Sequence, residues 1–279
     1  MKTIVIACTG EDSTTFLQNQ LTADVESISQ AQWGFAGYCS AKGRLFATFA
    51  VFPIPEGFYL VTHASVVEAV IARFELFRMR SKVNFSVEQD YRMICEYSAR
   101  PQTLPESLAK YMRANTSQPI RLGVVPQTLL TSQSTVVEID DESVLDRNLA
   151  LTLSENGIAW VEQSMAEIFL PQSLNLDLID AVSFKKGCYP GQEIVARIRY
   201  RGKPKQRMIA AQLPASFEGM IGDAIDLGHD SESRKATIVC STFDRVQDRI
   251  VILATVPVSA LNLNLGQHTV ADRISLKQI

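Results

Sequence analysis

The sequence is short of the features that mark several large classes of protein. No C-x-x-C pair occurs, and the five cysteines are widely spaced, at positions 8, 39, 95, 188 and 240. Such spacing argues against a metal or iron–sulfur cage, and a chain of this length can bury a core without disulfides. We therefore expect no metal site and a reducing compartment.

Membrane and secretory features are also scarce. No apolar run approaches the roughly 20 residues that a membrane-spanning helix needs. The apolar stretch at the start meets Glu11 and Asp12 too soon to form the core of a signal peptide. We expect a cytoplasmic protein with no membrane partner.

An excess of charge of either sign is absent as well. The 279 residues include 27 Lys and Arg against 30 Asp and Glu, which gives a formal net charge of -3. The composition, 46% hydrophobic and 20% charged, is that of a globular protein and excludes a chain that is disordered, collagenous or coiled-coil throughout. A slightly negative chain does not bind nucleic acid over its whole surface, so any basic site must be local.

Strand and helix patterns are mixed in the first half of the chain, whereas short strands fill the end. Apolar and β-branched runs predict strands at 3–9, 35–52 (two strands around a turn at 40–43), 58–62 and 83–97. Helical spacing of apolar residues predicts helices at about 12–28 and 64–80. Short runs punctuated by Gly and Asp predict further strands at 207–213, 236–242, 249–256 and 267–276. This order indicates an α+β fold with a small β-barrel as C-terminal domain.

The most informative stretch is 183–207, which reads SFKKGCYPGQEIVARIRYRGKPKQR. Cys188 lies between Gly187 and the pair Pro190-Gly191, a setting that can present a thiol on a tight, rigid turn. Positive charge on the preceding lysines favours the thiolate. The other four cysteines occupy strand-like contexts, where a small buried hydrophobe is expected.

Alternation in the following residues predicts a strand. Because residues i and i+2 share a face of a strand, Arg197, Arg199 and Arg201 would project together at intervals of about 6.6 Å. An arginine row suits carboxylates or phosphates. The solvated outer face of a hairpin accounts for the same spacing, and the sequence does not decide between the two.

The segment FKKGCYPGQEIVAR resembles the K-G-C-Y-x-G-Q-E signature of the YgfZ family, the folate-binding relatives of the glycine-cleavage aminomethyltransferase (T-protein). Three further segments resemble the same family: GEDSTTFLQNQLTADV at 10–25, YCSAKGR at 38–44 and FLPQ at 169–172. The resemblance therefore touches both halves of the chain, whereas the middle third matches poorly.

The resemblance implies a three-lobed, T-protein-like fold around a central cavity that accepts tetrahydrofolate or a derivative. It also implies a role in supporting iron–sulfur enzymes, including those that thiolate tRNA. These enzymes, or iron–sulfur assembly factors, would be the partners. Cys188 is then the expected functional thiol. The folate-binding residues that it implies are Lys186, Gly187, Tyr189, Gly191, Gln192, Glu193 and Arg197. We expect domain limits at 1–92, 93–204 and 205–279.

Two departures from the T-protein argue against aminomethyl transfer. Its acidic pair, in G-G-x-x-D-D, corresponds to the neutral Ala47-Thr48 here, which cannot accept a proton from a cationic amine. Its R-x-E-A-G segment corresponds to 183–187, where lysine replaces the carboxylate. Conventional enzymatic activity is thus not expected. Two alternatives stay open: a folate-dependent one-carbon or aminomethyl transferase, and a tRNA-binding module that uses the arginine row.

Overall fold

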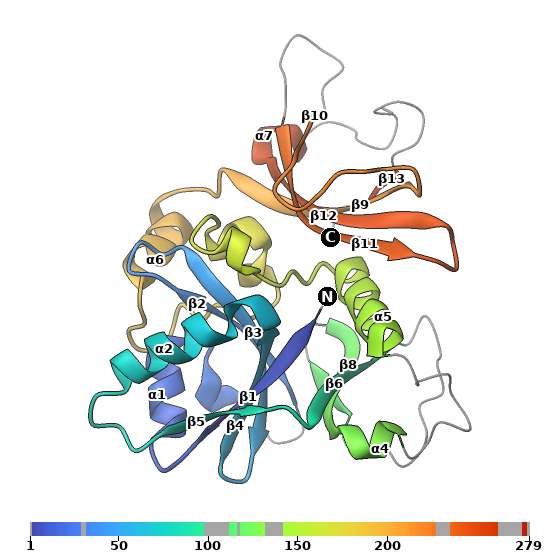
Figure 1. Cartoon of the computed structure of the whole chain (residues 1–279). Coiled ribbons are helices and arrows are strands. Elements are labelled where there is room, and N and C mark those ends of the chain that lie inside the picture. Colours follow the sequence, from blue (N-terminus) through green and yellow to red (C-terminus); the bar gives the residue numbers. More distant parts are fainter. Residues whose placement is uncertain are drawn as a thin grey trace.

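The computed structural model describes residues 2–28, 32–97, 112–115, 118–131, 142–226, 235–261 and 275–277. Within these ranges, three antiparallel sheets and the helices packed on them form three lobes (Figure 1). Among the described helices, none is both long and apolar enough to cross a membrane.

The first sheet has the strand order β2-β3-β4-β1-β5. Its strands are β1 (Thr3–Thr9), β2 (Gly34–Cys39), β3 (Leu45–Ile54), β4 (Gly57–His63) and β5 (Asn84–Glu88). The strands predicted for this part of the chain are therefore confirmed. Nine of the ten residues of β3 are buried, because both faces of the sheet are covered.

Two helices cover one face of the first sheet, α1 (Ser13–Gln20) and α2 (Val67–Arg78), with the 3₁₀ turns η1 (Val25–Ser27) and η2 (Ala64–Val66) beside them. The ring of Phe74 in α2 stacks on Phe49 of β3, with centroids 6.1 Å apart. On the other face, the ring centroid of Phe35 lies 5.4 Å from that of Trp160. The helix predicted at 12–28 is shorter than expected, because Leu21 is extended and pairs with Tyr38.

The second sheet has the order β6-β8-β7, with β6 (Tyr91–Tyr97), β7 (Arg113–Asn115) and β8 (Gln118–Pro126), followed by α4 (Gln127–Thr131). Helix α5 (Glu142–Glu155) packs between this sheet and the C-terminal one (Figure 1). At its end, Glu155 accepts a 2.7 Å bond from Arg249, which also binds the buried Asp244. The Arg249–Glu155 pair fastens α5 to the third lobe, and Asp244 holds Arg249 in place.

The third sheet is C-terminal and has the order β10-β11-β12-β9-β13. Its elements are β9 (Gln206–Pro214), β10 (Ala224–Asp226), β11 (Lys235–Asp244), β12 (Arg249–Pro257), α7 (Val258–Leu261) and β13 (Ser275–Lys277). The sheet curls like half a barrel (Figure 1), so the predicted α+β fold with a C-terminal β-unit is confirmed. Most of the strand predicted at 267–276 lies outside the described residues.

A linking segment, residues 167–183, runs between the lobes. It contains only the 3₁₀ turns η4 (Pro171–Leu174) and η5 (Leu176–Leu178), and it follows η3 (Gln163–Met165). Asn175, which has a φ of 59°, donates a 2.8 Å bond to the carbonyl of Met208 in β9. Arg207 donates to the Asp177 carboxylate and to the carbonyl of Gln172. The segment thereby docks the C-terminal sheet onto the first lobe and leads into the cysteine motif.

Candidate functional site

The arginine segment forms a helix, α6 (Gln192–Arg201), and the strand predicted for it is wrong. Arg197 and Arg201 are four residues apart and share a helix face, whereas Arg199 points elsewhere, so the three do not form a row. The apolar residues decide the outcome: buried Val195 and half-buried Ile198 are three apart, which is helical spacing. Gly191 begins the helix and Gly202 follows it.

Two glycines from separate motifs meet at the start of α6. Gly191 has a φ of +78°, and a Cβ on it would lie 2.4 Å from the carbonyl oxygen of Ser40 and 2.5 Å from the Cα of Gly43. Gly43 has a φ of +69°, and its Cβ would lie 2.9 Å from that of Ile194. Only glycine permits both the left-handed backbone and this approach. The turn at 40–43 and the cysteine motif therefore form one unit.

Lys186 anchors the cysteine loop to the first lobe. Its ammonium group donates to the carbonyl oxygens of Leu21 and Ala23, at 2.7 Å and 2.6 Å. It also lies 5.4 Å from the centroid of the Tyr189 ring, within range of a cation–π contact. Burial lowers the pKa of Lys186 to about 8, an effect that the carboxylates of Asp24 and Glu26 oppose. This lysine is thus a structural clamp.

Cys188 lies on the outside of the clamped loop. Its side chain is exposed, and around the exposed Gly187 there is open space where a Cβ would stand. Burial raises the pKa of each of the other four thiols, at positions 8, 39, 95 and 240. Because thiolates are the reactive species, those four are poor nucleophiles. The accessible thiol of this chain is Cys188.

The seven residues expected to bind folate fall into two groups. One group is held in contacts that fix the loop: Lys186, Tyr189 and Gly191. The side chain of Tyr189 is buried, with 5% exposed. Gln192 begins α6 and donates to the carbonyl of Gly187 at 3.3 Å. Gly187, Glu193 and Arg197 are exposed. The structure therefore brings all seven to one loop and helix, with three of them accessible.

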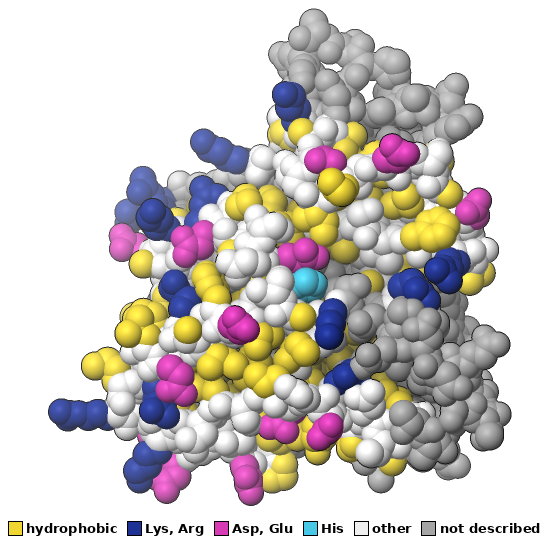
Figure 2. Space-filling view, viewed as in Figure 1, with side chains coloured by type: hydrophobic (Ala, Val, Ile, Leu, Met, Phe, Trp, Pro, Cys, Tyr) yellow, Lys and Arg dark blue, Asp and Glu magenta, His cyan; other side chains and the backbone are white. Residues whose placement is uncertain are grey.

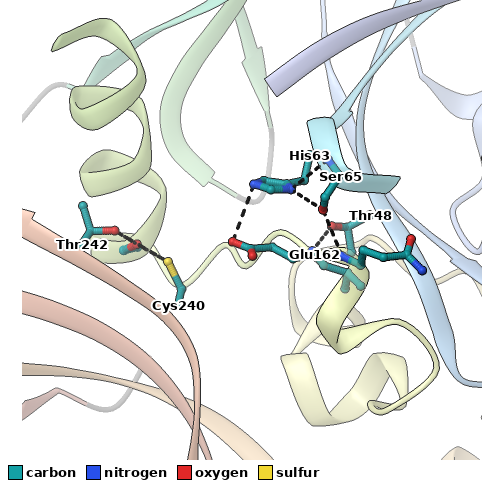
Figure 3. Close-up of polar contacts among 9 residues, drawn as sticks. Thr48, His63, Ser65, Glu162, Cys240 and Thr242 are labelled. Atoms are coloured by element: carbon teal, nitrogen blue, oxygen red, sulfur yellow. Dashed lines mark hydrogen bonds and ion pairs between the residues drawn. The ribbon is translucent and has the colours of Figure 1, made fainter. Parts of the chain in front are cut away.

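A second polar cluster lies where the lobes meet, and sequence reasoning missed it. His63, at the end of β4, points toward Glu162, with 3.6 Å between Nε2 and the carboxylate, while its Nδ1 lies 2.8 Å from the hydroxyl of Ser65 (Figure 3). Burial lowers the pKa of His63, and Glu162 acts in the opposite direction. Nearby, the Cys240 thiol lies 3.3 Å from the Ser154 hydroxyl. His63 and Ser65 are neighbours in the sequence, but Glu162, Ser154 and Cys240 are far from them, so the sequence carried no signal for the cluster.

Metal ligands are not gathered in the part of the chain that the structure describes. No group of three or more His, Cys, Asp or Glu side chains stands there in an arrangement that would hold an ion.

The fold is that of the glycine-cleavage aminomethyltransferases. The chain aligns with the crystal structure of glycine cleavage system aminomethyltransferase T from Bartonella henselae with a TM-score of 0.64, over 92% of this chain and 76% of that one. Sequence identity is 13%, so this likeness establishes the fold alone. The predicted T-protein-like arrangement is confirmed.

Sequence relatives are closer. Two curated proteins are 28% identical to this chain over 266 residues. Each is named tRNA-modifying protein YgfZ, and they come from Aliivibrio fischeri strains MJ11 and ATCC 700601 / ES114. The alignments cover 91% of this chain and 82% of each relative. No family model matches the chain. The resemblance indicated by the motifs is confirmed: the chain is a relative of the YgfZ proteins.

The contact between the two glycines gives a first prediction. Gly191→Ala should lower the free energy of unfolding by about 2 kcal/mol or more, because the methyl group meets backbone atoms and the φ is left-handed. Gly187→Ala, whose methyl group meets open space, is the matched control and should leave stability within about 0.5 kcal/mol. Urea unfolding measures both. Equal stability of the two variants would contradict the packing described.

The clamp gives a second prediction, on pH. Lys186 releases its proton near pH 8 in the folded chain but near the usual value of 10.5 when unfolded. The unfolded state therefore binds more protons between these values, and the stability contributed by Lys186 rises with pH across the window. Lys186→Met lacks this rise, so the wild-type advantage in free energy of unfolding should grow from pH 8 to pH 10.5.

Urea titrations at several pH values measure this difference, and Lys185→Met, which removes an exposed neighbouring lysine, is the control. A difference between wild type and Lys186→Met that stays flat or shrinks with rising pH would show that Lys186 is not a buried clamp.

Proposed function

We propose that this protein is a folate-binding accessory protein in tRNA modification, which supports iron–sulfur enzymes, including those that thiolate tRNA, with Cys188 as its functional thiol. The carrying observation is the exposed position of Cys188 on a loop that is fixed at both ends. The relatives named tRNA-modifying protein YgfZ support tRNA modification as the process.

The clamps on both sides of Cys188 support a functional role for the thiol. On one side the Lys186 ammonium binds two carbonyl oxygens of the first lobe, and on the other Gly191 packs against the turn at Gly43. A chance surface cysteine needs no such support, whereas a functional group must be held in a defined position. The clamps fix the place of the sulfur while leaving it open to a partner.

The T-protein fold and the family resemblance support tetrahydrofolate, or a derivative, as the ligand. In this proposal the exposed residues Gly187, Glu193 and Arg197 contact the folate, and Lys186, Tyr189, Gly191 and Gln192 hold the loop that presents them. The Arg197 guanidinium suits a carboxylate of the glutamate tail, which it can bind through two parallel hydrogen bonds.

An accessory role is favoured over aminomethyl transfer by the surroundings of Thr48. Its hydroxyl accepts a 3.0 Å bond from the Val161 N–H and lies 3.4 Å from the carbonyl oxygen of Ala159. Thr48 and Ala47 are both fully buried. Thr48 thus ties β3 to the segment that follows α5, and neither residue offers a carboxylate to handle an amine.

Folate binding leads to the third prediction. At a reduced-folate concentration about 100 times Kd, binding adds about 2.7 kcal/mol of stability, which for a chain of this size raises Tm by roughly 5–10 °C. Arg197→Ala should reduce that rise. Arg245→Ala removes the same charge from the turn between β11 and β12, and should keep the rise. No shift at saturating folate would refute folate binding, and equal losses in both variants would refute the role of Arg197.

Dependence on the thiol is the fourth prediction. In a strain without the gene, wild-type protein should restore thiolated tRNA nucleosides measured by mass spectrometry, and Cys188→Ala should not. Cys95→Ala, which removes a thiol from the interior, should restore them. Full restoration by Cys188→Ala would exclude the thiol from the function. Unchanged nucleosides in the strain that lacks the gene would exclude the role in tRNA thiolation itself.

A further inference from the structure

A pocket of 480 Å³ lies between the end of α6, the linking segment and the start of β9. Apolar side chains form part of its wall, from Ile168, Ile198 and Pro257. Its volume is in the range of cavities that hold small ligands, about 300–1,000 Å³. Cys188 and the seven residues assigned to folate do not line it. The pocket is thus separate from the proposed thiol site.

One residue that lines the pocket carries a buried side-chain oxygen with no hydrogen-bond partner. Gln172 lines the pocket and is only 1% exposed. Its Nε2 donates a 2.8 Å bond to the carbonyl of Val195 in α6, which fixes the amide, but its Oε1 has no hydrogen-bond partner. A buried acceptor without a donor is costly. A ligand with an N–H group at its inner end would satisfy it.

The rim of the pocket carries positive charge. Arg44, Lys203 and Lys205 line it and are exposed, and none of the residues that line it is acidic. The Arg44 guanidinium is held in place by the carbonyl oxygen of Ile168. In a chain whose formal net charge is -3, three cations at one mouth select an anion. The ligand therefore combines an apolar body, an N–H donor and negative charge.

Positive charge continues from the pocket along α6, together with aromatic rings. Arg197 and Arg201 are exposed, and Tyr200 is 68% exposed. The Arg199 guanidinium carbon lies 5.4 Å from the centroid of the Phe184 ring. That centroid lies 6.1 Å from the centroid of the Tyr200 ring. Lys and Arg side chains gather on the side of the molecule where α6 lies (Figure 2). Cations interleaved with exposed aromatic rings are typical of surfaces that bind single-stranded nucleic acid.

We propose that the pocket binds one nucleotide of a single-stranded RNA segment, and that α6 holds the neighbouring phosphates. This inference rests on the proposed role in tRNA modification. The base lies against Ile198 and donates an N–H to the Oε1 of Gln172, and its phosphate lies between Lys203 and Lys205. A polymer is favoured over a free nucleotide because the exposed Tyr200 and Arg201 of α6 do not line the pocket, and only neighbouring nucleotides would contact them.

The test is fluorescence anisotropy of the full chain with a short, end-labelled single-stranded RNA at several salt concentrations. Lys203→Ala with Lys205→Ala should weaken binding about tenfold and lower the slope of log affinity against log salt by about 0.7, the value for one phosphate. Ile198→Trp fills the pocket without changing charge, and should weaken binding roughly tenfold with the slope unchanged. Arg245→Ala removes one positive charge away from the pocket and is the control, with effects compared per charge removed. Arg245 lies in the turn before Arg249, at the end of the β9–β12 pair opposite Pro257 and Gln206, which line the pocket.

Three results would overturn the inference. The first is an equal effect of Arg245→Ala and the lysine variants, which would show general attraction only. The second is unchanged binding by Ile198→Trp, confirmed as folded by its melting curve. The third is competition by a nucleoside monophosphate at the same concentration as RNA, which would exclude the polymer. Folate takes no part in this measurement, so failure here leaves folate binding standing, and the reverse also holds.

Discussion

The hydrogen bonds of the linking segment, residues 167–183, are the constraint on which the arrangement of the lobes depends. This segment is largely buried yet has little regular structure, so its backbone groups must find partners elsewhere. Its partners come from three places: Leu45 of β3 bonds the carbonyl of Phe169, the Thr22 hydroxyl bonds that of Ala181, and Asn175 bonds Met208 of β9. Leaving one such group unpaired costs about 1–3 kcal/mol. Gln172 of the same segment also donates to the carbonyl of Val195 in α6. Because one stretch of chain bonds all these parts, it sets where the first lobe, α6 and the C-terminal sheet lie relative to one another.

The contact between Gly43 and Gly191 turns that arrangement into a site. The turn that carries Gly43 belongs to the first lobe, whereas Gly191 begins α6, and the backbones meet where no side chain fits. Lys186 adds a second attachment to the same lobe. With both ends of the loop held, Cys188 has little freedom to turn inward, and the exposure of its thiol follows from the packing on either side. The turn at 40–43 and the cysteine motif, which are far apart in the sequence, therefore form one structural unit.

The sequence predicted elements wherever apolar periodicity was unambiguous. The buried strands β1 to β4 and the β-rich C-terminal unit follow directly from runs of apolar and β-branched residues. Helix α6 was missed, because Val195 to Arg201 alternates apolar residues with arginine. The same stretch has helical spacing at Val195 and Ile198, and the burial of these two side chains favours the helix. The exposure of Cys188 was foreseen from its turn residues. The clamp by Lys186 was not, since its carbonyl partners near Leu21 come together only through tertiary packing.

The cysteine motif is longer than its thiol requires, and α6 accounts for the excess. Ten helical residues span about 15 Å, which separates Cys188 at one end from the pocket at the other. Not every basic residue in the motif serves a surface: Arg207 is used internally, in a pair with Asp177, whose side chain is 2% exposed. Lys186 is likewise used internally, as the clamp, whereas Arg197, Arg201, Lys203 and Lys205 are exposed and would attract an anion to this side of the molecule. One helix thus connects a fixed thiol to a local cationic surface. A long anionic substrate bound along this helix would have one defined part of its length next to the sulfur.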